Sequence, residues 1–203
     1  IHILPHWNWP DRKGEVTPVY VYTDGVEGEL FLNGKSQGRI KKNKESRMDR
    51  FRLRWNDVKY EPGELKVVVY DEKGTKIGEA VRRTTGDPAA IKVDVDCPDN
   101  NGQKLKANGN DMAFLTVSLV DKDGLVCPTA SDDITFNVSG DGKFQACCNG
   151  DATSLEVFTN PQMKLFNGQL VAVVRSGKKA GKITVTVNDK THNFSKTVEI
   201  STV

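Results

Sequence analysis

Residues 19–38 read VYVYTDGVEGELFLNGKSQG, and this stretch decides the fold. Val19 to Tyr22 and Glu29 to Leu32 are runs of β-branched, aromatic and apolar residues that favour strands. Asn33-Gly34 predicts a tight turn, because both residues tolerate the positive φ that a two-residue hairpin requires. Lys35 to Gly38 then forms the returning strand. We therefore expect the stretch to form the edge of an antiparallel β-sandwich.

The residues that follow continue the strand pattern. Residues 51–55 (FRLRW) alternate apolar and charged side chains, which predicts a strand with Phe51 on its apolar face. Residues 65–70 (LKVVVY) are β-branched and apolar on both faces, which favours a central strand. The intervening turn at Glu61-Pro62-Gly63-Glu64 has proline at the position where its fixed φ suits a turn.

The second half of the chain repeats this organisation. Residues 91–96 (IKVDVD) alternate, residues 112–120 predict a long strand with a return over residues 125–127, and Ile134, Phe136 and Val138 alternate again. Strands about 10 residues apart, without an amphipathic helix, are typical of immunoglobulin-like sandwiches. Gly86-Asp87-Pro88 marks the best boundary. We expect an all-β chain of two tandem immunoglobulin-like antiparallel β-sandwich domains, over residues 1–86 and 87–203.

Composition excludes several classes of partner. The 203 residues carry a net charge of only +2, so no overall field attracts nucleic acid or an anionic membrane. A basic run over residues 39–54 lacks the interleaved aromatic residues that would stack on bases, and we interpret it as a solvated face. No apolar run approaches the roughly 18 residues that span a bilayer. We expect neither nucleic-acid binding nor membrane insertion.

Four cysteines give little guidance on chemistry. No C-x-x-C pair occurs, so we predict no zinc site. Cys147 and Cys148 are neighbours, and a bridge between adjacent residues is strained. We expect all four thiols to be reduced; the alternative is a bridge between Cys97 and Cys127, or between one of these and Cys147.

The first ten residues, IHILPHWNWP, are the most aromatic part of the chain. They are too apolar for a free tail, and the main interpretation is a linker that packs on a neighbouring domain. A second interpretation is a platform in which His6, Trp7 and Trp9 contact a sugar, because aromatic faces suit the apolar faces of sugar rings. Metal binding by His2 and His6 is a weaker third, since no carboxylate or cysteine lies at a useful spacing.

No catalytic motif is present in the sequence. Glycoside hydrolysis needs two carboxylates held about 5 to 10 Å apart with separated pKa values, and the acidic residues here fall in predicted turns or on polar strand faces. Asp121-Lys122-Asp123-Gly124 resembles a calcium loop, but its glycine falls too early. The longest predicted irregular stretch is residues 149–166, a length typical of functional loops. We predict no catalytic residue, no metal site and no cofactor.

An ordered series of motifs resembles the C-terminal region of bacterial β-galactosidases of glycoside hydrolase family 2, of the kind abundant in Bacteroides. The likeness covers nearly the whole chain. Its motifs are His6-Trp7-Asn8-Trp9, residues 17–23 (TPVYVYT), 29–36 (ELFLNGKS), 60–65 (YEPGEL), 120–124 (VDKDG), 138–140 (VSG) and 166–168 (FNG).

The resemblance implies a parent enzyme with a sugar-binding jelly roll, an immunoglobulin-like domain and a (β/α)₈ barrel upstream. The barrel would carry the two glutamates of a retaining mechanism, so no catalytic residue is carried over to this chain. Its partner would be the upstream catalytic domain of the same protein, with His6, Trp7 and Trp9 at the interface, and the location periplasmic or extracellular. An independent carbohydrate-binding module and an adhesin-like spacer are the alternatives.

Overall fold

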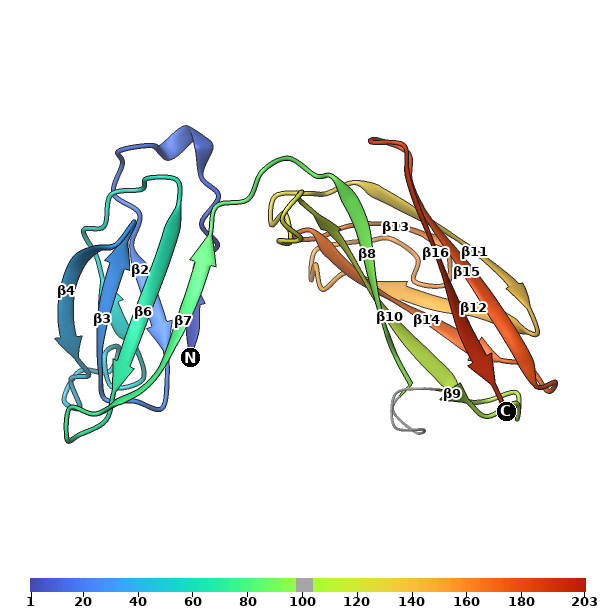
Figure 1. The fold of residues 1–203 in the computed structure, drawn as a ribbon, viewed down its shortest axis with the longest axis horizontal. Helices are drawn as coiled ribbons and strands as arrows, with labels where there is room; N and C mark the ends of the chain where they lie inside the picture. The colour runs from blue at the N-terminus through green and yellow to red at the C-terminus, as the bar shows by residue number, and fades with distance from the viewer. Residues whose placement is uncertain (98–103) are drawn as a thin grey trace. The chain divides into compact units, whose positions relative to one another are not determined.

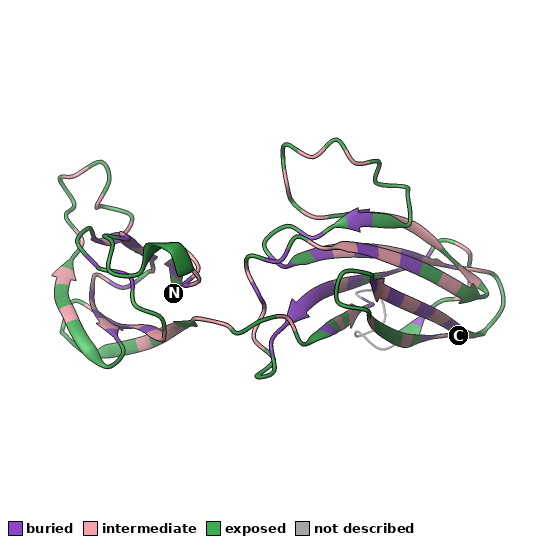
Figure 2. Cartoon of the chain, turned by 90° about the horizontal axis from the view of Figure 1, so that it is seen from above, coloured by how far each residue is buried: buried purple, intermediate pink, exposed green. Residues whose placement is uncertain are grey.

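The computed structural model describes residues 1–97 and 104–203, which form strands, turns and one short 3-10 helix, η1 (Pro10–Arg12). The chain divides into two compact domains, Ile1–Thr85 and Gly86–Val203, one residue from the boundary expected from Gly86-Asp87-Pro88. Both are β-sandwiches, as predicted (Figure 1). In Figure 2 the buried residues run along the strands, whereas the loops are largely exposed or half-buried. No helix within the described residues is long and apolar enough to cross a membrane.

The first domain has two antiparallel sheets that enclose one core. The three-stranded sheet has the order β1 (His2–Leu4), β2 (Val19–Tyr22) and β5 (Leu53–Trp55). The four-stranded sheet has the order β4 (Lys35–Lys41), β3 (Glu27–Leu32), β6 (Glu64–Tyr70) and β7 (Lys76–Arg83). The edge position of β4 and the inner position of β6 agree with the sequence patterns.

The Asn33-Gly34 turn forms as predicted, with φ of 49° at Asn33 and 79° at Gly34. Asn33 also reaches a second turn. Its Nδ2 donates to the carbonyl oxygen of Pro62 at 3.0 Å, and its Oδ1 accepts from the backbone nitrogen of Glu64 at 2.8 Å. The side chain therefore ties the β3–β4 hairpin to the turn that starts β6, which fixes both turns at one end of the sandwich.

Two predictions for the first domain were wrong. Phe51 is 66% exposed and lies before β5, because the chain around it forms turns, including a hydrogen bond from the Arg50 nitrogen to the Ser46 oxygen. Residues 2–4 were expected in a linker but form β1, which pairs with β2 in register Ile3 to Val21. Residues 2–4 are therefore an edge strand of the first domain, and residues 1–10 are called the leader below.

The second domain also has two sheets around one core. The first has the order β12 (Gly142–Cys148), β14 (Gln169–Ser176), β10 (Met112–Val120) and β8 (Ala90–Asp96). The second has the order β13 (Gln162–Lys164), β11 (Asp133–Gly140), β15 (Gly181–Asp189), β16 (Phe194–Thr202) and β9 (Lys104–Leu105). The β9–β16 pair is parallel and the other strand pairs are antiparallel.

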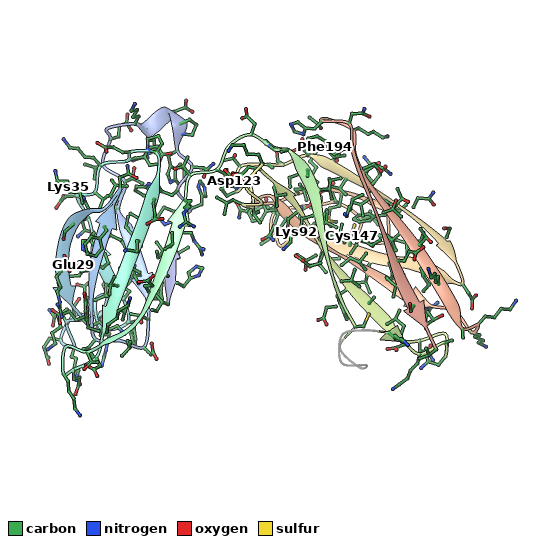
Figure 3. All side chains as sticks on the ribbon, in the orientation of Figure 1. Glu29, Lys35, Lys92, Asp123, Cys147 and Phe194 are labelled. Carbon is green, nitrogen blue, oxygen red and sulfur yellow. The ribbon has the colours of Figure 1, made fainter. Side chains whose placement is uncertain are left out.

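The second domain differs from the sequence predictions in two places. Residues 125–127 do not form a returning strand; a single bridge joins Val120 to Val126. The expected irregular stretch of residues 149–166 contains β13, which pairs with β11. No disulfide joins the four cysteines, and Cys147 lies among the side chains between the sheets (Figure 3).

Candidate functional site

The predicted interface residue Trp7 is part of the core of the first domain. Its side chain is 1% exposed, its Nε1 donates to the carbonyl oxygen of Glu61 at 3.0 Å, and its ring meets Tyr60 edge-on with centroids 5.0 Å apart. A ring so enclosed has no free face for a sugar or for another domain. The structure therefore gives Trp7 a packing role.

The other two candidates, His6 and Trp9, form a half-buried stacked pair. Their ring centroids are 4.3 Å apart at an interplanar angle of 18°, and the Trp9 Nε1 donates to the backbone oxygen of His6 at 2.9 Å. The His6 Nδ1 accepts from the backbone nitrogen of Asn8 at 3.2 Å, and burial lowers the pKa of the imidazole. A neutral imidazole on the indole makes a largely apolar partner surface, so both remain candidates for contact with a sugar or a neighbouring domain.

Hydrogen bonds also fasten this leader to the end of the first domain. Asn8 exchanges two with Thr85: its Nδ2 donates to the Thr85 Oγ1 at 2.7 Å, and the Thr85 nitrogen donates to its Oδ1 at 3.1 Å. The Thr84 hydroxyl donates to the carbonyl oxygen of Trp7 at 2.6 Å. The leader and residues 84–85 are thus held together, although 77 positions separate the bonded residues in sequence.

Hydrogen bonds lower the pKa of several carboxyl groups. A hydrogen bond from Arg54 lowers the pKa of Asp49, one from Lys76 lowers that of Glu79, and those from Thr153 lower that of Asp151. Among the described residues, every carboxyl group with a resolved shift has its pKa lowered. A general acid for glycoside cleavage requires a raised pKa, so these groups suit structure and not proton donation.

Asp121, from the calcium-like motif, organises a turn. Desolvation opposes its ionisation, but three backbone amides lower its pKa: those of Gly86 at 3.0 Å, Asp123 at 2.9 Å and Leu125 at 2.9 Å. The residue is 4% exposed. Its carboxylate therefore ties the first residue of the second domain to the turn after β10, and amide donors occupy the oxygens that a calcium ion would need.

The segment of residues 149–161 exposes apolar side chains. Leu155 is 96% exposed, Val157 57% and Phe158 55%. Glu156 and Val157 line a shallow pocket of about 580 Å³ with residues at the start of β11 and β13. Apolar side chains exposed together often mark a contact site, so this segment remains a second candidate for contact with a sugar or another domain.

A further cluster was not predicted from sequence. Asp132, Asp189 and His192 offer ligand atoms that all lie within 4.8 Å of one another. They come from two separate parts of the second domain, so the only local signal is the three-residue spacing of Asp189 and His192. Within the described part of the chain this is the one group of three such residues, and neither His2 nor His6 belongs to it.

Each of the two domains contains a match to a known family model. Residues 98–198 match the family model described as glycoside hydrolase family 2 C-terminal domain 5, and residues 14–78 match a domain of unknown function, DUF4982. The chain belongs to the C-terminal domains of glycoside hydrolase family 2. The family 2 match covers the second domain, the DUF4982 match lies in the first, and the resemblance of the chain to this family is confirmed.

Related proteins match between 74% and 98% of this chain. The protein named beta-galactosidase BoGH2A of Bacteroides ovatus is 35% identical over 190 residues, which cover 94% of this chain and 21% of that protein. A putative beta-glucuronidase of Formosa agariphila is 32% identical over 154 residues, 74% of this chain and 14% of that protein. A family 2 glycosyl hydrolase structure from Bacteroides cellulosilyticus matches with a TM-score of 0.87 and 31% identity, over 98% of this chain and 24% of that one. The chain spans about a quarter or less of the length of these relatives.

Proposed function

We propose that the chain forms the non-catalytic C-terminal part of a larger exported β-galactosidase and supports its catalytic domain. The observation that carries the proposal is the match of residues 98–198 to a family 2 C-terminal domain, together with 35% identity over 94% of this chain to a protein named as a beta-galactosidase. The ionised, turn-anchoring carboxylates are consistent with a role outside the chemistry.

The relatives that match this chain carry names that imply different substrate classes for the parent enzyme. The 35% identity to the Bacteroides ovatus protein favours β-galactosides, and the 32% identity to the Formosa agariphila protein makes β-glucuronides the competing class. The whole product of the gene that encodes this chain should be assayed with nitrophenyl β-galactoside and nitrophenyl β-glucuronide. Preferential hydrolysis of the glucuronide would refute the galactosidase assignment and leave the domain role intact.

The supporting role is tested by truncation of that gene product at the residue before Ile1. If the two domains support the catalytic domain, the truncated enzyme should lose activity at a lower temperature than the full-length enzyme. Equal thermal inactivation of the two proteins would refute support by these domains. Addition of the separate 203-residue chain to the truncated enzyme provides a second measurement, since restored heat resistance would show direct contact.

Carbohydrate binding by the domains themselves is the second candidate function. The His6–Trp9 stack favours it, because both rings are half-buried and keep part of their surface accessible. Tryptophan fluorescence should be followed during titration with galactose, galactans and glucuronate. A saturable change that disappears in Trp9→Ala supports this function, whereas an unchanged spectrum at millimolar sugar excludes the stacked pair as a sugar site.

A further inference from the structure

Two carboxylates and one imidazole meet at one end of the second domain. Asp132 directly precedes β11, Asp189 is the last residue of β15, and His192 lies in the turn that leads into β16. Antiparallel pairing brings them together, because Ile134 of β11 is opposite Asp189 of β15. The imidazole also stacks on Phe194, at the start of β16, with ring centroids 5.3 Å apart, and Figure 3 labels that phenylalanine.

One imidazole nitrogen faces both carboxylates. The Nδ1 of His192 lies 2.9 Å from the Oδ2 of Asp189 and 3.3 Å from the Oδ1 of Asp132. The other oxygen of Asp189 accepts from the backbone nitrogen of Thr191 at 2.8 Å, which fixes the orientation of that carboxylate. Since Nδ1 carries at most one proton, it can donate one good hydrogen bond and not two.

Burial makes this arrangement costly without a further positive charge. The side chain of Asp189 is 0% exposed and that of Asp132 is 10% exposed, whereas that of His192 is 32% exposed. Among the described residues, only the His192 imidazole forms an ion pair with Asp132 or Asp189. The Asp132 carboxylate, nine-tenths buried, points at the same nitrogen and forms no side-chain hydrogen bond with the described part of the chain. Buried carboxylates are normally paired or bound to a metal.

We propose that Asp132, Asp189 and His192 form a binding site for a divalent transition-metal cation. Zinc binds imidazole nitrogen and carboxylate oxygen at about 2.0–2.2 Å. For a cation about 2.1 Å from Nδ1 and from a carboxylate oxygen, the 2.9 and 3.3 Å separations correspond to nitrogen–metal–oxygen angles of roughly 85–105°, between octahedral and tetrahedral values. A dication also neutralises the two carboxylates, and the partly exposed imidazole side offers an entry path.

The cation would have a structural role. It would join the start of β11 to the β15–β16 turn, and water would complete the coordination left open by three protein ligands. Mixed nitrogen and oxygen ligands favour zinc, cobalt, nickel or manganese over magnesium and calcium, which prefer oxygen. The proposal is independent of the role in a glycoside hydrolase, so either can fail without the other.

Isothermal titration of the chelator-treated 203-residue chain with Zn²⁺ tests the proposal, together with the absorption spectrum of added Co²⁺. We expect one ion per chain, with an affinity reduced at least tenfold in Asp132→Asn and in His192→Gln. Zinc at one hundred times its dissociation constant should raise the unfolding midpoint of the second domain by on the order of 10 °C. Mg²⁺ at the same concentration should have no comparable effect.

His2→Ala and Asp123→Asn are the matched controls, because both remove an exposed ligand type outside the cluster, and they should bind zinc as the parent chain does. Circular dichroism verifies that the variants are folded. His192→Gln should disturb folding less than Asp132→Asn, because the His192 side chain is more exposed. No saturable binding, or equal zinc affinity in the cluster variants and the controls, would show a hydrogen-bonded cluster without a metal function.

Discussion

Replacement of Trp7 by alanine should unfold the first domain far more easily while leaving the second domain unchanged. The indole is 1% exposed, and burial of about 200 Å² of aromatic surface at about 25 cal/mol per Å² contributes ~5 kcal/mol. Substitution would also leave the Glu61 carbonyl without its donor and remove the edge contact with Tyr60. Measured tryptophan-to-alanine changes in cores cost about 3–5 kcal/mol, which agrees with this figure.

Such a loss is large for a domain of this size. At 0.05–0.15 kcal/mol per residue, the 85 residues of Ile1–Thr85 should have a stability of roughly 4–13 kcal/mol. A loss of about 4 kcal/mol should lower the midpoint of the first domain by roughly 15–30 °C. Differential scanning calorimetry of the two-domain chain measures both transitions in one experiment, and the second domain serves as an internal standard.

Trp7→Phe and Trp9→Ala are the controls. Phenylalanine retains most of the apolar volume but not the hydrogen bond, so its cost should be about a third of that of alanine. Trp9 is half-buried, so its truncation should cost less than that of Trp7. Equal midpoints for Trp7→Ala and the parent chain would refute the conclusion that the leader is part of the first domain.

Three further predictions concern other parts of the chain. Asp121→Ala should destabilise the second domain by about 2–4 kcal/mol at pH 7 through the loss of three amide hydrogen bonds. Because the pKa of Asp121 is lowered in the folded state, this stabilisation is present above about pH 4 and is lost as the pH falls through the folded-state pKa. The urea midpoints of the two proteins should therefore converge at low pH, and a constant difference down to pH 2 would contradict the role of Asp121. Burial raises the pKa of Cys147 to about 11, so iodoacetamide at pH 8 should label the exposed Cys148 and not Cys147, and mass spectrometry that finds both labelled in the native protein would contradict the packing. Gly63→Ala should lower the stability of the first domain by about 2–3 kcal/mol, because φ is 136° and the added Cβ would lie 1.9 Å from the Asn33 Oδ1. The control Gly74→Ala has open space around the added Cβ and should lower the stability by about 1 kcal/mol. Equal denaturant midpoints for the two variants would argue against the Asn33 tether.

Local patterns in the sequence were sufficient for much of the sandwich. The Asn33-Gly34 turn and the inner position of β6 follow from turn chemistry and from a run of valines, both of which act over a few residues. Strand β1 was missed because three residues carry little periodicity, and its partner β2 begins 15 positions after it ends. Phe51 continues an alternating pattern, yet the strand begins only at Leu53, so the pattern placed its boundary wrongly.

The candidate sites depended more on tertiary contacts. The aromatic leader was recognised, but burial of Trp7 depends on Tyr60 and Glu61, more than 50 positions away. The cluster of Asp132, Asp189 and His192 arises from the register between β11 and β15, which no local pattern in a single sequence specifies. The sequence argued against a calcium loop at Asp121 but did not predict another role, and the three amides around the carboxylate reveal its role in the turn.

We propose that these domains support a glycosidase without performing its chemistry. The most direct measurement is the rate at which the purified 203-residue chain hydrolyses nitrophenyl β-galactoside and nitrophenyl β-glucuronide, with the whole gene product as the positive control. We predict a rate equal to that of buffer for the isolated chain and rapid turnover for the whole protein. Hydrolysis by the isolated chain that survives repurification and saturates with substrate would contradict the account.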